Sequence, residues 1–114
     1  MNSAEKKQLD ICEKHGSEFV PSKPLEKVGI ALDTLGKKPL NALRHPRQGD
    51  TCGWYIWGGE NLSEASNFFQ PLHVHHLEAK CPEIIPFLGL APGWRVLLTS
   101  EHEDVWYDES LLHI

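Results

Sequence analysis

Gly53-Trp54-Tyr55-Ile56-Trp57 is the stretch of the chain that decides the fold. Aromatic and β-branched side chains pack well on a pleated, half-buried surface, so residues 53–57 are predicted to form the clearest strand. Alternation along a strand points Trp54 and Ile56 to one face, and Tyr55 and Trp57 to the other. Either both faces of the sheet are covered, or one face exposes aromatic side chains, which are preferred anchors of protein interfaces.

Toward the N-terminus, residues 44–52 are polar and rich in residues that break regular structure, which predicts a loop. Two apolar segments, 28–32 and 40–44, flank a turn and are predicted to pair as an antiparallel hairpin. The segment 25–35 also fits one face of a helix, and Gly29 weighs only modestly against that alternative.

The first residues of the chain, 1–16, are predicted to form a helix. Ser3 is a good N-cap, Glu5 suits the positive end of the helix dipole, and Gly16 is a natural residue just past the end. The apolar stripe of this helix is narrow, so we expect it to pack against the edge of the domain. Residues 17–26 are predicted to be an extended connection.

Toward the C-terminus, residues 60–72 are predicted to form a polar loop and residues 72–80 a short helix. Pro82 suits the first position of a second helix. Pro86 keeps that helix short, and Gly89-Leu90 fits a Schellman ending.

Two strands complete the pattern, one over residues 94–99, which we expect to be buried on both faces, and one over residues 104–108. These elements predict an α+β fold. Its mostly antiparallel sheet has four or five strands, on which the N-terminal helix and the two short helices pack. At 114 residues, the chain is expected to form a single domain over residues 1–114.

The net charge of −5 is distributed unevenly. Residues 1–47 hold nine Lys/Arg and six Asp/Glu, a balance of +3, whereas residues 48–114 hold two and ten, a balance of −8. Phosphates would be repelled by the acidic half, which argues against a nucleic acid as the partner. A protein with a basic surface would instead be attracted.

Targeting signals and cysteine usage indicate a cytoplasmic protein. No apolar run is long enough to span a membrane, and the first residues lack the apolar core of a signal peptide, so no membrane partner is expected. The three cysteines are an odd number without a CxxC pair, so we expect reduced and at least partly buried thiols.

Local motifs give little support to catalysis or to a metal site. If His73-Val74-His75-His76 is helical, His73 and His76 share a face while His75 points away, and two ligands are too few for zinc. Cys81 is the best nucleophile candidate, yet nothing local activates it. We therefore expect no catalytic residues, no bound metal and no cofactor.

Three segments resemble a family of bacterial immunity-protein domains of polymorphic toxin systems. They are a Gly-Trp strand that ends in Gly and an acidic residue (52–60), a Pro-Glu-Ile helix with its following strand start (81–95), and Asp104–Asp108. The resemblance spans roughly residues 26–112 and leaves the N-terminal helix outside. Thr51-Cys52 stands where the family commonly has Asp-Ser, which indicates a divergent branch. The resemblance implies a small α+β protein that neutralises a co-encoded toxin by binding it.

A protein with this function must bind tightly and quickly, which favours complementary charge around aromatic anchors on its binding surface. The partner-binding surface is therefore predicted to include these acidic and aromatic residues: Trp57, Glu60, Glu101, Glu103, Asp104, Trp106, Asp108 and Glu109. Two alternatives stay open. One is a small enzyme or metal-binding protein that uses His73, His76 and Cys81, and the other is a structural domain that self-associates through its aromatic face.

Overall fold

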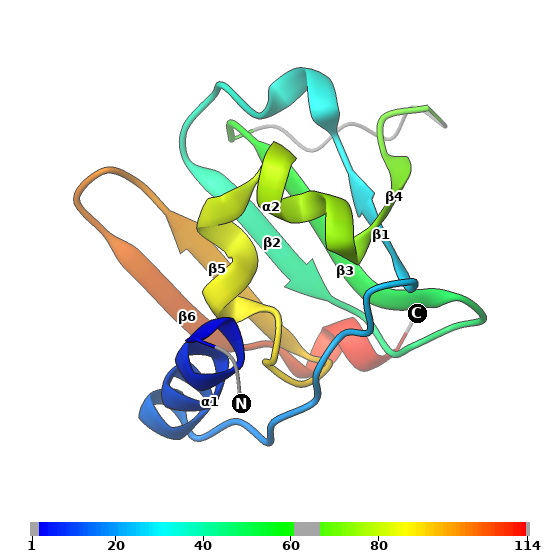
Figure 1. Ribbon diagram of the computed structural model, residues 1–114. Coiled ribbons are helices and arrows are strands. Elements are labelled where there is room, and N and C mark those ends of the chain that lie inside the picture. Colours follow the sequence, from blue (N-terminus) through cyan, green and yellow to red (C-terminus); the bar gives the residue numbers. More distant parts are fainter. Residues whose placement is uncertain (1–2, 61–66, 114) are drawn as a thin grey trace.

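The computed structural model describes residues 3–60 and 67–113 (Figure 1). Its α-helices are α1 (Ser3–His15) and α2 (Leu77–Lys80), and its 3-10 helices are η1 (Leu32–Thr34), η2 (Val74–His76), η3 (Pro82–Phe87) and η4 (Glu109–Leu112). Its strands are β1 (Lys27–Ile30), β2 (Leu40–Arg44), β3 (Thr51–Gly58), β4 (Gln70–His73), β5 (Trp94–Leu98) and β6 (Glu103–Tyr107).

The N-terminal helix and its ending agree with the sequence prediction. Gly16 adopts a positive φ of 80°, a conformation that glycine reaches without steric cost. The N–H groups of Gly16 and Ser17 both donate to the carbonyl oxygen of Cys12 at 2.9 Å. These bonds satisfy a carbonyl that the end of the helix would otherwise leave free.

The six strands form one sheet in the order β4-β1-β3-β2-β5-β6. Neighbouring strands are antiparallel except for β1 and β3, which are parallel. The α+β class with a mostly antiparallel sheet is therefore confirmed, with six strands where four or five were predicted. The Gly-Trp strand, β3, lies inside the sheet and is its longest strand.

The hairpin predicted for residues 28–32 and 40–44 is wrong, because β3 lies between β1 and β2. The alternative helix over residues 25–35 is also wrong, since β1 occupies Lys27–Ile30 and only η1 follows it. The connection from β1 to β2 is longer than a hairpin loop of about 2–5 residues, so it can cross a strand. Placing β3 between two neighbours pairs the backbone groups on both of its edges.

The helix predicted over residues 72–80 begins later than expected. Gln70–His73 forms β4, which pairs with β1 at the edge of the sheet, and only Val74–Lys80 is helical. An edge strand tolerates Pro71, whose missing N–H is not needed by a further neighbour. Residues 61–66 of the predicted polar loop lie outside the described residues.

The short helix after Cys81 is confirmed as η3, but its predicted Schellman ending is absent from this described segment. Gly89 does not adopt the positive φ that this ending requires. Its lack of a side chain instead lets the Phe19 ring approach, because a Cβ on Gly89 would lie 2.7 Å from that ring. Leu90 is fully buried and forms an isolated β-bridge with Phe19.

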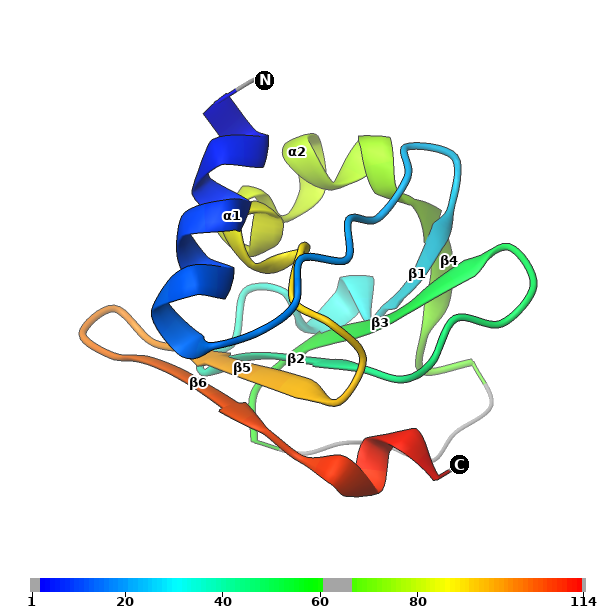
Figure 2. The same cartoon turned by 90° about the horizontal axis from the view of Figure 1, so that it is seen from below.

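Helices α1, α2 and η3 cover one face of the sheet, while η4 lies on the other (Figure 2). The main core fills the space between the helices and the sheet, and it includes Trp54 and Ile56. A second, smaller cluster on the opposite face is formed by Ala31, Leu43, Trp57 and Leu111. This cluster does not reach β5, where only Val96 is buried, so the prediction that this strand is buried on both faces is wrong.

Arg44 is the one charged side chain that is buried in the described part of the chain, at 0% exposure. Its guanidinium donates to the carbonyl oxygens of Val20 and Leu90, each at 2.6 Å, and of Cys52 at 3.0 Å. It also lies 5.6 Å from the centroid of the Trp54 ring. Arg44 thus joins the segment after α1, strands β2 and β3, and the chain between η3 and β5.

Candidate functional site

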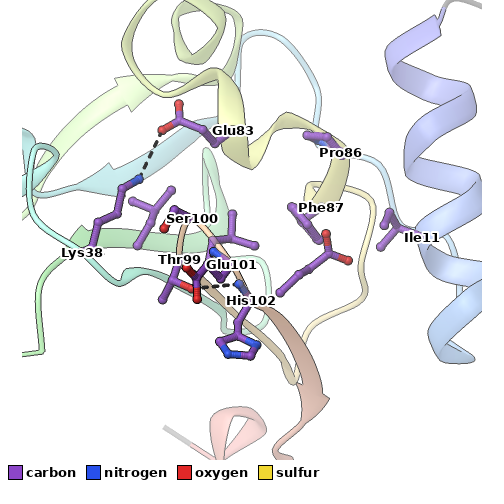
Figure 3. A pocket seen from close by; sticks show the side chains of 12 residues that line it. Ile11, Lys38, Glu83, Pro86, Phe87, Thr99, Ser100, Glu101 and His102 are labelled. Carbon is purple, nitrogen blue, oxygen red and sulfur yellow. Dashed lines mark hydrogen bonds and ion pairs between the residues drawn. The ribbon is translucent and has the colours of Figure 1, made fainter.

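An open groove of about 480 Å³ lies between α1, η3 and the turn that joins β5 to β6 (Figure 3). We call it the acidic groove. Its apolar lining consists of Ile11, Leu40, Pro86, Phe87 and Leu98. Its polar lining consists of Lys38, Glu83, Thr99, Ser100, Glu101, His102 and Glu103. An apolar floor with a charged rim is the arrangement by which protein interfaces combine affinity with orientation.

Three carboxylates line this groove, and only two of them lie near a lysine, each at the limit of an ion pair. Glu83 lies 3.9 Å from Lys38, and Glu103 lies 3.9 Å from Lys14. Both pairs are well exposed, so each contributes little to stability. The carboxylate of Glu101 has no ion pair with a described residue. Basic side chains of a partner could therefore replace the internal lysines at small cost.

The turn that carries Glu101 is held in place by Thr99. The hydroxyl of Thr99 accepts hydrogen bonds from the N–H groups of Glu101 at 3.2 Å and His102 at 2.9 Å. The N–H of Thr99 in turn donates to the carbonyl oxygen of His102 at 2.9 Å. These local bonds satisfy the backbone of the turn and leave the side chains of Glu101 and His102 exposed.

Strand β6 sends its side chains to two different faces. Glu103, Val105 and Tyr107 lie on the helix-covered face, where Val105 packs against the main core. Asp104 and Trp106 lie on the opposite face, where Arg95 sits 5.5 Å from the Trp106 ring centroid. The predicted acidic and aromatic residues of β6 are thus divided between the two faces of the sheet.

Strand β6 is also an edge of the sheet, opposite β4. Among the described strands it pairs only with β5, so the backbone N–H and C=O groups on its outer side have no strand partner. Such an edge can accept a strand of another chain, and acidic side chains limit unspecific pairing. Trp106 is 39% exposed and Tyr107 is 49% exposed, so aromatic surface is available on both faces of this edge.

Asp108 follows β6 and organises the chain toward η4. Its carboxylate accepts hydrogen bonds from the N–H and hydroxyl of Ser110 and from Arg95 at 3.1 Å. The bonds from Ser110 and then Arg95 hold the pKa of Asp108 below its usual range. Asp108 is half-buried, so its first role is to cap η4, while Glu109 beside it is exposed.

The structure gathers six of the eight predicted surface residues along the β5–β6 turn, β6 and the start of η4, namely Glu101, Glu103, Asp104, Trp106, Asp108 and Glu109. Glu60 is exposed and lies two residues beyond Gly58, which belongs to the same row across the sheet as Glu103. Three strand spacings separate Gly58 from Glu103, which is about 14 Å, so Glu60 lies apart from the other six residues.

Trp57 does not belong to an exposed surface. Its exposure is 4%, and it packs in the second cluster beside Phe69, with 6.2 Å between the ring centroids. Sequence alternation correctly points Trp57 away from Trp54, but it cannot show that Leu111 and Phe69 cover this face. The prediction that Trp57 presents its ring to a partner is corrected on this ground.

Several groove residues escaped the sequence analysis. Lys38 lies in the turn before β2, and Glu83 and Phe87 lie on η3, far from the acidic turn along the chain. Their residue types alone carry no signal for a site. Only the packing of η3 over the end of β2 and β5 brings them to one groove.

The three histidines of the 73–76 segment lie together, contrary to the prediction from a helix. One side-chain nitrogen from each of His73, His75 and His76 lies within 4.8 Å of the others. The ring centroids of His75 and His76 are 4.0 Å apart, and His73 stacks on His75 at 5.5 Å. Desolvation, then the neighbouring His76 and His73, lowers the pKa of His75.

The cysteines form no disulfide with one another and are buried, as expected for the predicted thiols. Burial raises the pKa of the Cys81 thiol to about 11, and nearby Glu83 acts in the same direction. A thiol with this pKa is protonated at neutral pH and is a poor nucleophile. This environment weighs against the alternative enzyme that uses Cys81.

None of the helices in the described residues has the length and apolarity needed to cross a membrane. In comparisons with known proteins, the family model of the Imm33-like domain matches residues 7–108. The match begins inside α1, so it includes most of the helix that the motif resemblance leaves outside. No curated protein and no solved structure matches the chain.

Proposed function

The chain belongs to the Imm33-like domain family, and on that premise we propose that it neutralises a toxin protein by binding it directly. Imm-named domains are immunity proteins of polymorphic toxin systems. The family match is the observation that carries the proposal. Such a protein acts as a binding partner and not as a catalyst, which agrees with the buried, protonated Cys81.

The partner-binding surface of this proposal is the acidic groove together with the β6 edge. Apolar side chains of the toxin would pack on the floor formed by residues such as Phe87 and Leu98. Basic side chains would pair with Glu101 and Glu103, the latter exchanging its weak contact with Lys14. Trp106 and Tyr107 would serve as aromatic anchors on the two sides of the edge.

The charge distribution supports a toxin with a basic surface. Residues 48–114 carry a balance of −8, and the groove and β6 belong mainly to this half of the chain. Complementary charge accelerates encounter and suppresses wrong partners, two properties that an immunity protein requires. The same charge disfavours nucleic acid, and the proposal includes a cytoplasmic location where the toxin is made.

The experiment begins by identifying the toxin with the purified full chain as bait in its native host, at low and moderate salt. The toxin domain is then produced and titrated with wild-type protein and a double variant, Glu101→Lys with Glu103→Lys. The matched control reverses two other exposed carboxylates, Glu18→Lys with Glu78→Lys, which changes the net charge equally.

We expect the groove variant to lose about 100-fold or more in affinity, because two attractions become repulsions worth several kcal/mol together. The control is expected to change affinity by less than about threefold, since these carboxylates lie outside the proposed contact. Equal losses of affinity in the groove variant and the control would show that the change in net charge alone causes the loss. Unchanged affinity in the groove variant, with an intact fold, would contradict the proposed surface.

A further inference from the structure

The cluster of His73, His75 and His76 lies far from the acidic groove in the sheet. His73 ends β4, the edge strand opposite β6, and the other two histidines belong to η2, which follows at once. Figure 1 shows this corner, where β4 runs beside β1 and leads into α2. Nothing in the proposed toxin contact uses these side chains.

The backbone that carries the three rings is fixed by the neighbouring chain. His73 pairs with Lys27 in the β1–β4 ladder. The N–H of Val74 donates to the carbonyl oxygen of Glu26 at 2.9 Å, and the N–H of His75 donates to that of Pro24 at 3.2 Å. The extended turn at His73 thus places its ring beside the two that follow, which a continuous helix could not do.

The imidazole nitrogens are close enough to share one ion. A tetrahedral site with Zn–N bonds of about 2.0–2.1 Å places its nitrogens about 3.3 Å apart. The nitrogens of His73, His75 and His76 already lie within 4.8 Å of one another. The rings of His75 and His76 are exposed and that of His73 is half-buried, so small side-chain rotations can close the remaining distance.

The three rings are also available as ligands. None of them has a hydrogen bond or an ion pair with another described residue, so no group in the described part of the chain competes for the lone pairs. Lys27 is the nearest cation along the ladder, but its ammonium is held by the carboxylate of Asp50 at 3.0 Å. Asp50 also interacts electrostatically with His73 and so brings a negative charge toward the cluster.

We propose that His73, His75 and His76 form a binding site for one divalent transition-metal ion. Imidazole ligands suit Zn²⁺, Ni²⁺, Cu²⁺ and Co²⁺, whereas Mg²⁺ and Ca²⁺ prefer oxygen. Three ligands from this chain leave at least one coordination position open. This assignment replaces the expectation of no metal, which assumed a helix that turns His75 away from the other two.

The test uses Zn²⁺ as the probe, titrated calorimetrically into the full metal-free chain in a buffer that does not bind metals. The variants are His73→Gln, His75→Gln and His76→Gln, each of which keeps a polar side chain but removes the imidazole. The control is His113→Gln, because His113 is an exposed histidine that follows η4 and does not line the acidic groove. Circular dichroism in the presence of a chelator checks the fold of every variant.

We expect saturable binding of one Zn²⁺ per wild-type chain and a loss of affinity of at least about tenfold in each of the three variants. The control is expected to bind as the wild type does. Zinc should also raise the unfolding temperature of the wild type by more than that of His75→Gln, because an ion that binds only the folded state stabilises it more when it binds more tightly. If His73→Gln fails to fold, the two exposed positions decide the outcome.

Absent or unsaturable binding, or full affinity after removal of any one ring in a folded variant, would overturn the site. A visible spectrum of the Co²⁺-loaded chain separates ligand types. A spectrum typical of Co²⁺ bound by imidazole without thiolate supports the assignment, whereas a thiolate charge-transfer band would show that a cysteine has been recruited and would also overturn it. None of these measurements involves the toxin, so their failure is independent of the proposed immunity function.

Discussion

Replacement of Arg44 by methionine is expected to destabilise the fold by about 3 kcal/mol. Methionine is similar in length but has no hydrogen-bond donor. The carbonyl oxygens of Val20 and Leu90 have no other described donor, so Arg44→Met leaves both without a partner. Each orphaned carbonyl costs about 1–3 kcal/mol, which sums to about 2–6 kcal/mol.

Two further terms act on this sum. The substitution also removes the hydrogen bond to Cys52 and the contact with the Trp54 ring, and the latter is worth about 1 kcal/mol or more when desolvated. In the opposite direction, it relieves the burial of a charge, a penalty of several kcal/mol. Burial lowers the pKa of Arg44 to about 10, so the guanidinium is still charged at neutral pH and this relief is real. The net result is a loss of about 3 kcal/mol.

The assay is urea unfolding followed by far-UV circular dichroism, which avoids the local effect of Arg44 on Trp54 fluorescence. The matched control is Arg95→Met on β5, where a half-exposed arginine meets Asp108 at 3.1 Å and a loss below about 1 kcal/mol is expected. For a chain of this length, 3 kcal/mol corresponds to a fall in Tm of about 12 °C.

Equal stability of the two variants would refute this reasoning. That result would mean that relief of the buried charge offsets the orphaned carbonyls, as when buried ion pairs are replaced by apolar side chains. Arg44→Lys would then localise the error. Lysine keeps the charge but cannot reproduce the planar fork of donors, so it should fall between the wild type and the methionine variant.

Two other predictions concern pH and the aromatic residues. The Arg47 guanidinium donates to both carboxylate oxygens of Glu26, at 2.6 and 2.8 Å, and lowers the pKa of Glu26 from 4.5 to about 2. Because the pKa of Glu26 is lower in the folded state than in the unfolded state, the pair stabilises the fold fully above about pH 5, and this stabilisation is lost as the pH falls toward 2. Glu26→Gln should therefore lower the free energy of unfolding by about 1–2 kcal/mol at pH 7, a value that allows for the exposure of Arg47. In unfolding titrations, the variant should also depend less on acidic pH than the wild type does. A variant as acid-sensitive as the wild type would count against the pair. Trp57→Ala should lower stability by about 3–5 kcal/mol in unfolding experiments, because Trp57 is buried. Trp106→Ala should lower it by under about 1 kcal/mol but weaken toxin binding at least tenfold in calorimetry, because Trp106 is exposed on the proposed surface. The reverse pattern would contradict the core position of Trp57 and the surface position of Trp106.

The features that were predicted correctly from the sequence are those set by residues close together in the chain. The N-terminal helix ends where its glycine stands, because the cap depends on residues within one turn. The Gly-Trp strand is recognised because its alternating side chains require two buried faces. The family resemblance rests in part on this strand, and the family match agrees with it.

The candidate surface was predicted only where it is continuous in the chain. The residues from Glu101 to Glu109 are neighbours in sequence, so the turn and β6 bring them together without help from topology. Glu83 and Lys38 join the groove through contacts between distant segments, and no local pattern identifies them. The sequence analysis set the three histidines aside because two residues of β4, Leu72 and His73, were assigned to a helix, which turned His75 away from His73.

By itself, the sequence determined the α+β class, the acidic half, the buried reduced cysteines and the position of the central strand, since all of these follow from composition and local periodicity. The tertiary structure alone decided the strand order, the burial of Trp57 beneath Leu111 and Phe69, and the burial of Arg44 at the end of β2. The physical reason is that strand pairing and the covering of a sheet face depend on which distant segments meet. Local propensity sets the shape of each segment, but the burial of apolar surface between segments selects their neighbours.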